Sequence, residues 1–157
     1  MQYGFLLTFQ CSTLRLSDAI SVNQEATEVA VLDISACFDK ASYETGVNRK
    51  LLVVIAYVES GLRSDALNRN SNGTYDIGLM QINSSNIPKL KRMGIIQKEE
   101  DLWDTCTNIR AGAYLLKECI AIYDLSWRAV DCYNKGSKAK DISKYVWKVY
   151  KVLSTVR

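Results

Sequence analysis

Residues 51–61, LLVVIAYVESG, are the stretch that decides the fold. Eight apolar residues lead directly to a carboxylic acid, Glu59, and Gly61 follows two positions later. Apolar character on every side is typical of a helix at the centre of a protein, and glycine is a common residue just beyond a helix end. The pattern therefore predicts a central helix over residues 49–60 with Glu59 in its last turn.

A carboxylate beside so many apolar residues raises a question about its role. Inside a protein, an unpaired charge costs several kcal/mol or is removed by taking up a proton. Two explanations for Glu59 stay open at this point: it reaches water at the helix end, or its surroundings keep it partly protonated for catalysis.

The composition favours one mainly helical domain. The chain has 157 residues, of which 48% are apolar, and it contains one proline and eight glycines. A chain of this length suits a single domain, and few prolines and glycines favour helices over a fold with many turns. We predict a mainly α fold of the α+β kind: a helical bundle around the central apolar helix, with one small β-hairpin.

Charge is distributed unevenly along the chain. The net charge is +3, yet residues 1–36 carry four acidic groups and one basic group, so the rest is more positive. A positive balance suits either a solvated surface or an anionic polymer as substrate. We expect no nucleic-acid partner, because no basic run is interleaved with aromatic residues. No apolar run reaches the roughly 20 residues that a membrane span needs, so we expect no stable membrane insertion. We also expect a monomer.

Five cysteines and the absence of histidine bear on metals and disulfides. The cysteines stand at positions 11, 37, 106, 119 and 132 without CxxC spacing, so we expect no metal site. We favour two disulfides, Cys119–Cys132 across a helix hairpin and Cys37–Cys106, with Cys11 left over; buried free thiols are the alternative. Disulfides would imply an oxidising compartment.

The first 36 residues differ from the rest of the chain. YGFLLTF at residues 3–9 is apolar but short, and no lysine or arginine precedes it, which makes a poor secretion signal. A diverged leader stays open, because ISA before Cys37 offers a small residue where cleavage would be natural. We predict an atypical N-terminal segment over residues 1–36 and the functional domain over residues 37–157.

A β-hairpin is expected after the central helix. Asn72 and Gly73 predict a two-residue turn, since both central positions of such a turn must accept positive φ. The returning strand would carry Asp76, and side-chain alternation turns Asp76 away from its two neighbours. Asp76 stands 17 residues after Glu59.

Four further helices are expected. CFDKASYET, residues 37–45, predicts a short helix that Gly46 ends. The helical period of apolar residues predicts the other three over residues 107–123, 127–134 and 141–153. The apolar side of the last helix would include Ile142, Tyr145 and Val149.

Glu59 and Asp76 together point to a reaction. Cleavage of a glycosidic bond needs an acid that an apolar site keeps protonated and a solvated carboxylate that supports positive charge at the sugar carbon. The sequence surroundings of the two carboxylates supply that contrast. Each alone would be ordinary, Glu59 as an exposed residue at a helix end and Asp76 as a hairpin residue.

The segment VESGLRSDALNRNSNGTYDIGLMQIN, residues 58–83, resembles both the soluble lytic transglycosylases and the c-type lysozymes, two branches of the lysozyme-like fold. Glu59 and Ser60 match the catalytic Glu-Ser of the transglycosylases. GLMQIN, residues 78–83, is similar to their Gly-Leu-Met-Gln signature. The separation of Glu59 from Asp76 resembles the spacing of acid and aspartate in the lysozymes. The resemblance implies a lysozyme-like fold.

The resemblance continues downstream to about residue 150. YNKG, residues 133–136, is similar to the Tyr-Asn-Ala-Gly turn of the transglycosylases, with Lys135 in place of the usual small residue. The chain most resembles the small, specialised transglycosylases of type III and type IV secretion systems and type IV pili. Their two shared cysteines are matched by Cys37 and Cys106.

The resemblance implies roles for individual residues. Glu59 would be catalytic and would perform both proton transfers. Asp76 would act as a charge stabiliser or nucleophile, orient sugar or water, or hold the hairpin. Tyr133 would hydrogen-bond to Glu59 or to the substrate. The residues expected to bind the glycan are Ser60, Gly78, Met80, Gln81, Asn83, Tyr133 and Asn134.

The resemblance also implies a reaction and a location. The family cleaves the MurNAc-β-1,4-GlcNAc bond of peptidoglycan with formation of 1,6-anhydroMurNAc and without a cofactor. We therefore expect a periplasmic enzyme that acts on glycan strands, with a secretion-system or pilus protein as a partner. One alternative is a lysozyme-type muramidase that uses Glu59 and Asp76 with water. The other is an inactive peptidoglycan-binding scaffold of a secretion apparatus.

Overall fold

The structure of the protein, a computed structural model, describes residues 16–156. Within the first helix it describes the side chains of Gln24 and Thr27 and those from Asp33 onward. The prediction for Cys11 therefore lies outside the described residues, as does part of the predicted N-terminal segment.

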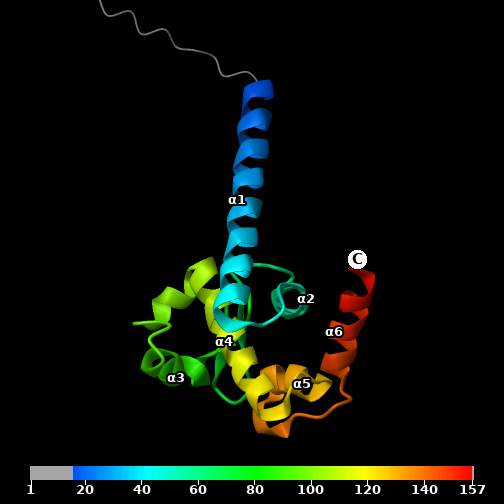
Figure 1. Ribbon diagram of the computed structural model, residues 1–157. Coiled ribbons are helices and arrows are strands. Elements are labelled where there is room, and N and C mark those ends of the chain that lie inside the picture. The colour runs from blue at the N-terminus through cyan, green and yellow to red at the C-terminus, as the bar shows by residue number, and fades with distance from the viewer. Residues whose placement is uncertain (1–15, 157) are drawn as a thin grey trace, which may run out of the picture. The chain divides into compact units, whose positions relative to one another are not determined.

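The first helix, α1 (Leu16–Thr45), is longer than the sequence predicts (Figure 1). The predicted helix over residues 37–45 forms only its last turns, so that prediction is wrong in extent. No proline or glycine occurs in α1, and nothing in the local sequence stops the helix before Gly46. The chain divides within this helix into two units, Met1–Asp33 and Ile34–Arg157, and the candidate site lies in the second.

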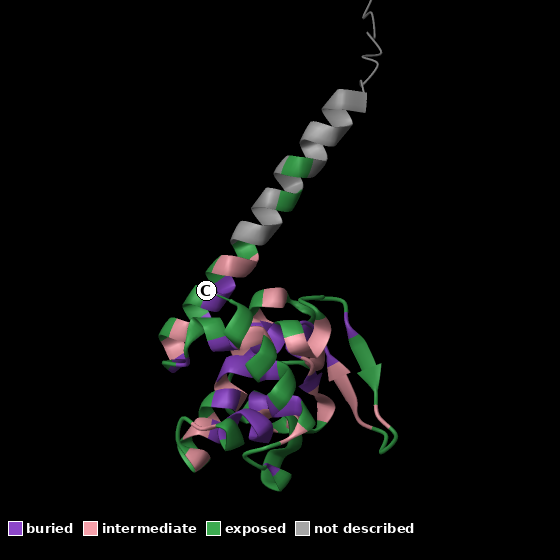
Figure 2. Ribbon diagram, turned by 90° about the vertical axis from the view of Figure 1, so that its right-hand side faces the viewer, coloured by how far each residue is buried: buried purple, intermediate pink, exposed green. Residues whose placement is uncertain are grey.

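Helix α2 (Arg49–Ser60) is the apolar helix that the sequence predicts. It begins after Asn48, whose side-chain oxygen accepts a hydrogen bond from a backbone amide of the first turn. It ends at Gly61, which adopts the left-handed conformation at φ 66°. Its buried residues, purple in Figure 2, are Leu51, Leu52, Val54, Ile55 and Ala56. Glu59 therefore extends from the end of a helix that is anchored in the core.

The predicted hairpin belongs to a three-stranded antiparallel sheet. Strands β1 (Leu67–Arg69) and β2 (Tyr75–Ile77) pair with Asn68 opposite Asp76. A third strand, β3 (Ile82–Asn83), pairs with β2 on its other side. The sheet thus brings Asp76 into the middle of three strands.

The turn between β1 and β2 is longer than predicted. The backbone amide of Asn70 donates to the carbonyl of Thr74 at 2.8 Å, and that of Gly73 donates to the carbonyl of Asn70 at 3.1 Å. Of the two residues expected at positive φ, only Gly73 has it, at 84°. Asn72 instead accepts hydrogen bonds from the amide and hydroxyl of Thr74. The two-residue turn is therefore wrong, and one left-handed glycine closes a longer loop.

The helices that follow the sheet confirm the predicted order. The short helices are η1 (Ser84–Asn86), α3 (Ile87–Arg92), η2 (Glu99–Trp103) and η3 (Gly136–Lys138). The longer helices are α4 (Thr105–Tyr123), α5 (Trp127–Lys135) and α6 (Lys144–Thr155), each begun by a side-chain cap, Asp104, Ser126 and Ser143 respectively. Ile142 precedes α6 and is 77% exposed, so its predicted place on the apolar side is wrong, whereas Tyr145 and Val149 are buried.

Contacts among the long helices build the hydrophobic core. Helix α2 contacts α4 and α6, and α5 contacts the same two helices (Figure 1). Both favoured disulfides are present: Cys37–Cys106 joins α1 to α4, and Cys119–Cys132 joins α4 to α5. The predicted mainly α, lysozyme-like fold with a small sheet is confirmed.

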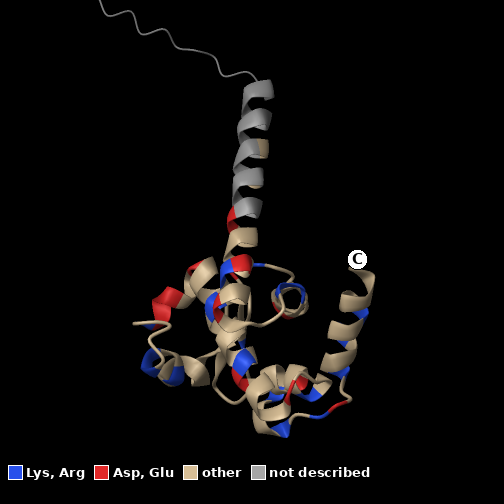
Figure 3. Cartoon of the chain, viewed as in Figure 1, with Lys and Arg blue, Asp and Glu red and all other residues tan. Residues whose placement is uncertain are grey.

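Charged residues are spread over many elements of the second unit. Figure 3 shows lysine and arginine in blue on several helices, with acidic residues in red between them. This mixture suits the solvated surface that the composition allows. Among the described residues, no helix has both the length and the apolar character that crossing a membrane requires.

Candidate active site

Glu59 lies on the wall of a groove of about 760 Å³. The groove is lined by the end of α2, the sheet, and parts of α3, α4 and α5. The other predicted site residues that line it are Asp76, Gln81, Asn83, Tyr133 and Asn134. The fold therefore gathers both predicted carboxylates and four predicted glycan-binding residues around one open space.

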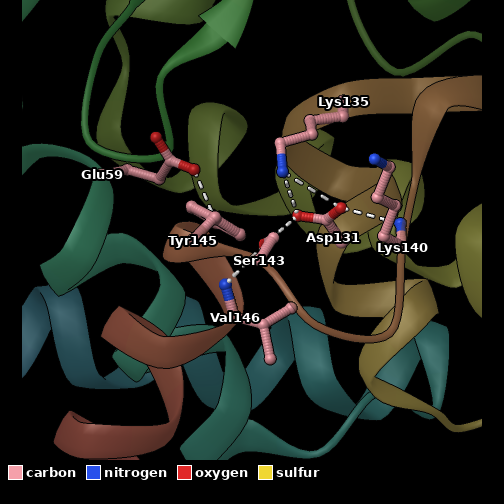
Figure 4. Close-up of polar contacts among 7 residues, drawn as sticks. All are labelled: Glu59, Asp131, Lys135, Lys140, Ser143, Tyr145 and Val146. Atoms are coloured by element: carbon pink, nitrogen blue, oxygen red, sulfur yellow. Dashed lines mark hydrogen bonds and ion pairs between the residues drawn. The ribbon is translucent and has the colours of Figure 1, made fainter.

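A tyrosine from the far end of the chain holds Glu59. The hydroxyl of Tyr145, near the start of α6, donates to Oε1 of Glu59 at 2.6 Å (Figure 4). Tyr145 is 8% exposed, so this hydroxyl has little access to water. Because Oε1 accepts this bond, a proton on the Glu59 carboxyl group is carried by the other oxygen, Oε2.

The surroundings of Glu59 raise its pKa to about 7. Burial is the main cause, since it disfavours the charged form of a carboxyl group. The hydrogen bond from Tyr145 opposes the rise in pKa, the negative charge of Asp76 adds to it, and the positive charge of Lys148 opposes it. Near neutral pH both protonation states of Glu59 are populated, as a group that donates and then accepts a proton requires.

Asp76 has polar surroundings instead. Asn83 Nδ2 donates to its Oδ1 at 2.7 Å, and Asn70 Nδ2 donates to its Oδ2 at 3.0 Å. Both amides also donate to the hydroxyl of Thr74, which fixes their orientation. The structure thus places one carboxyl group at the end of an apolar helix and the other among amides, the contrast that the sequence predicts.

Three residues predicted to bind glycan, Ser60, Gly78 and Met80, do not line the groove. The hydroxyl of Ser60 donates to the carbonyl of Leu79 at 2.7 Å, which ties the end of α2 to the loop after β2. Met80 is completely buried, and Gly78 adopts φ 72°, a value that favours glycine. In the structure these residues shape the loop behind the groove, and a direct role for them in binding glycan stays a prediction.

Asn108 of α4 holds the same loop and is absent from the residues predicted from the sequence. Its Nδ2 donates to the carbonyls of Ile77 at 3.0 Å and Leu102 at 2.8 Å, and its Oδ1 accepts from the amide of Met80 at 2.8 Å. Asn108 is 1% exposed, so all three bonds are shielded from water. The signal for such a residue is a polar side chain at a buried helical position, because it must find partners there.

Gln81 lines the groove in an unusual backbone conformation. Its φ of 49° is left-handed, which is uncommon for a residue other than glycine and recurs at functional sites. Its Nε2 donates to the carbonyls of Gly78 at 2.9 Å and Ala66 at 3.3 Å. Because both bonds use the amide nitrogen, the side-chain oxygen is the atom that Gln81 can offer to a ligand.

Tyr133 lines the groove, but its hydroxyl donates to the carbonyl of Met80 at 2.7 Å. The resemblance implied a bond from Tyr133 to Glu59 or to the substrate. The bond to Glu59 comes from Tyr145 instead, and a bond from Tyr133 to the substrate stays a prediction. A buried tyrosine hydroxyl needs a partner, and this rule is the signal that marks Tyr145 as more than a core residue. Burial, together with the charges of Glu59 and Asp76, raises the pKa of Tyr133 well above its ordinary value, so the hydroxyl stays protonated.

The other charged residues that line the groove are paired. Lys89 Nζ donates to Glu118 Oε2 at 2.8 Å, and Lys135 Nζ donates to Oδ1 of Asp131 at 3.0 Å. Among the side chains that the structure describes, no group of three or more His, Cys, Asp or Glu is placed to hold a metal ion.

The fold and this groove define a lysozyme-like protein. The chain belongs to the family described as "Transglycosylase SLT domain", whose family model matches residues 36–151. This family acts on peptidoglycan, so its members are expected to bind glycan strands in such a groove.

Three curated relatives cover most of the chain. This chain is 38% identical over 123 residues to "Invasion protein IagB" of Salmonella typhi. The matching region covers 74% of this chain and 76% of the relative. The chain is 36% identical over 118 residues to "Protein IpgF" of Shigella flexneri, with 73% and 77% covered. It is also 36% identical over 125 residues to a "Peptidoglycan-binding-like protein" of Escherichia coli O157:H7, with 74% and 75% covered.

Proposed function

We propose that the protein is a lytic transglycosylase that cleaves the MurNAc-β-1,4-GlcNAc bond of peptidoglycan and forms 1,6-anhydroMurNAc. The observation that carries this proposal is Glu59, a carboxyl group with a pKa of about 7 on the wall of a groove of about 760 Å³. One group with such a pKa can serve as both acid and base near neutral pH.

Glu59 performs two proton transfers in the proposed reaction. Oε2 carries the proton and delivers it to the glycosidic oxygen, so the bond to the muramic acid carbon breaks and the GlcNAc end leaves as an alcohol. The 2-acetamido group of the sugar stabilises the carbon left behind. The Glu59 carboxylate then takes the proton of the C6 hydroxyl, whose oxygen closes the anhydro ring within the same sugar. The intramolecular attack benefits from proximity.

Neighbouring residues support these steps. Tyr145 keeps the carboxyl group oriented through Oε1. Gln81, Asn83, Tyr133 and Asn134 line the groove where the sugars would lie. Asp76, held by two amides, orients the sugar or stabilises positive charge at its reacting carbon.

The second candidate reaction is that of a muramidase, in which water replaces the C6 hydroxyl. The carboxylate of Asp76 favours this candidate, because lysozyme-type hydrolysis uses a second carboxylate beside the acid. Digestion of purified peptidoglycan followed by mass spectrometry separates the two reactions. Anhydro ends, lighter than reducing ends by one water molecule, are expected; reducing ends alone would establish the muramidase instead.

The same digestion tests whether the protein is an enzyme at all. Glu59→Gln keeps the size of the side chain and removes its proton transfer, so we expect no lysis of sacculi by this variant. Absence of clearing by the wild-type protein between about pH 4 and pH 8 would favour the inactive scaffold.

We further propose that the protein works in the periplasm and opens the cell wall locally for a secretion system or pilus. The support is the similarity to a protein named "Invasion protein IagB" and the two disulfides, which suit an oxidising compartment. Complementation of a deletion strain with wild type and with Glu59→Gln, with secreted protein as the readout, tests this role. Equal secretion in both strains would contradict it.

A further inference from the structure

Asp131 of α5 is a buried charge that the proposed reaction does not use. Its relative exposure is 0%, and it is the only acidic or basic residue found fully buried in the part of the chain that the structure describes. Burying a carboxylate is unfavourable unless it is paired and hydrogen-bonded. Its position therefore calls for a reason.

Three donors surround the carboxyl group of Asp131. Lys135 Nζ lies 3.0 Å from Oδ1 and 3.2 Å from Oδ2, the backbone amide of Lys140 lies 2.8 Å from Oδ2, and the hydroxyl of Ser143 lies 2.5 Å from Oδ1. Burial raises the pKa of Asp131, but the bonds from Ser143, Lys140 and Lys135 outweigh it, so the pKa falls below its ordinary value. Asp131 is thus ionised near neutral pH.

The donors connect Asp131 to the beginning of α6. Ser143 is the N-cap of α6, and its oxygen accepts from the amide of Val146 at 3.1 Å while its hydroxyl donates to Asp131. The Lys140 amide fixes the loop that leads into this helix. Two residues after Ser143 stands Tyr145, whose hydroxyl reaches Glu59. Figure 4 shows the contacts of Asp131 with Lys135, Lys140 and Ser143 and, separately, the contact of Tyr145 with Glu59.

We propose that Asp131, with Lys135 as its counter-ion, is a positioning residue for Glu59: it holds the first turn of α6 so that the Tyr145 hydroxyl stays on the Glu59 carboxyl group. The part of this proposal that rests on the proposed function is the catalytic role of Glu59. The positioning of Tyr145 and Glu59 by Asp131 does not depend on it. The proposal also explains Lys135, which replaces the usual small residue in the YNKG turn, because the lysine neutralises the buried carboxylate.

A purely structural role would produce a different result. If Asp131 only stabilises the loop between α5 and α6, its replacement lowers thermal stability and leaves the titration of Glu59 unchanged. If it positions Tyr145, its replacement weakens a hydrogen bond that lowers the pKa of Glu59, so the titration moves to higher pH. Direct removal of a nearby negative charge would move the titration the other way.

The test is a ¹³C NMR titration of the Glu59 side chain in the full-length protein, with the signal assigned by Glu59→Gln. Asp131→Asn and Tyr145→Phe should each move the midpoint to higher pH. In the double variant, the midpoint should move no further than in Tyr145→Phe alone, because both changes break the same contact. The other ionisable groups that face Glu59, which are Asp76 of β2, Tyr133 of α5 and Lys148 of α6, stay in place in all variants.

Two further variants keep the test decisive. Asp141→Asn removes an exposed carboxylate from the same loop. In this variant, the midpoint of the Glu59 titration should match that of the wild type. Ser143→Ala leaves the ion pair of Lys135 with Asp131 intact but removes the hydrogen bond from Ser143 that links Asp131 to α6. If Asp131→Asn does not fold, Ser143→Ala should show the same shift of the Glu59 midpoint to higher pH. An unchanged Glu59 midpoint in Asp131→Asn or Ser143→Ala, or additive shifts in the double variant, would overturn the proposal. Since the titration needs no activity, these outcomes are independent of whether the protein lyses peptidoglycan.

Discussion

At the scale of single residues, Glu59 combines burial with hydrogen bonding. Burial favours its protonated form, while the hydroxyl of Tyr145 and the charge of Lys148 favour the ionised form. Asp76 opposes these two through its negative charge. The resulting pKa of about 7 is a balance of named neighbours, so replacement of a single neighbour should disturb it.

The raised pKa of Glu59 predicts a dependence of stability on pH. Between the unfolded pKa of about 4.3 and the folded pKa, the native state keeps a proton that the unfolded state has lost. This contribution to stability is fully present below the unfolded pKa and is lost as pH rises through about 7. Glu59→Gln does not ionise, so at pH 8 its free energy of unfolding should exceed that of the wild type by about 1–3 kcal/mol.

Urea denaturation at pH 4 and pH 8 measures this difference. The exposed Glu100 provides the matched control, and Glu100→Gln should keep the pH dependence of the wild type. If Glu59→Gln loses stability with rising pH as steeply as the wild type, the raised pKa is contradicted.

The hydrogen bonds of Asp76 predict that its charge matters for the reaction. In Asp76→Asn, the new amide group would meet the amide of Asn70 or Asn83, both of which donate to the carboxylate in the wild type. We expect a loss of lytic rate of about 100-fold, typical of a displaced electrostatic group in an active site.

Turbidity of a sacculus suspension reports this rate. Asp65→Asn, a change at an exposed aspartate after α2, should lyse at the rate of the wild type. Wild-type lysis by Asp76→Asn would remove Asp76 from the catalytic set and leave it as a hairpin residue.

At the scale of elements, the groove depends on how the loop between β2 and β3 attaches to α4. Asn108 bonds to three backbone groups around this loop, and Ser60 bonds to it from the end of α2. At Gly112 of α4, an added Cβ would lie 2.9 Å from the hydroxyl of Tyr133, so helix and groove wall are closely packed. The position of the loop therefore depends on these neighbours as well as on its own residues, such as Gly78 at positive φ.

Replacement of Asn108 should test this attachment. Asn108→Ala leaves the Met80 amide and two carbonyls without their partners in a buried place, which should reduce the free energy of unfolding by about 3 kcal/mol and also slow lysis. Urea denaturation at neutral pH measures the loss. Asn68→Ala, at an exposed position of β1, should change stability little, and an equally small change in Asn108→Ala would contradict the role assigned to this amide.

At the scale of the whole molecule, two disulfides join elements that are distant in sequence. Cys37–Cys106 closes a separation of 69 residues and Cys119–Cys132 a separation of 13. In the chain-entropy model, a cross-link stabilises the fold by restricting the unfolded chain, more so for the longer loop. Both cysteines of the second pair also line the groove.

The loss of stability on removal of each disulfide should follow the order of the loop lengths. We expect Cys37→Ser/Cys106→Ser to lower the free energy of unfolding by about 4 kcal/mol and Cys119→Ser/Cys132→Ser by about 3 kcal/mol. Denaturation with and without dithiothreitol measures both effects, and the reductant should have no further effect on a variant that lacks all four cysteines. A wild-type protein insensitive to the reductant would contradict the predicted contribution.

By itself, the sequence determined the apolar helix α2, the position of Glu59 in its last turn and the strand with Asp76. Periodicity, caps and spacing encode these features because they depend on neighbours along the chain. Only the tertiary structure decided that Tyr145 and not Tyr133 bonds to Glu59, that Asn108 holds the loop after β2, and that Asp131 anchors α6. Such contacts join residues as far as 86 positions apart, and they depend on how whole helices pack, which no local pattern records.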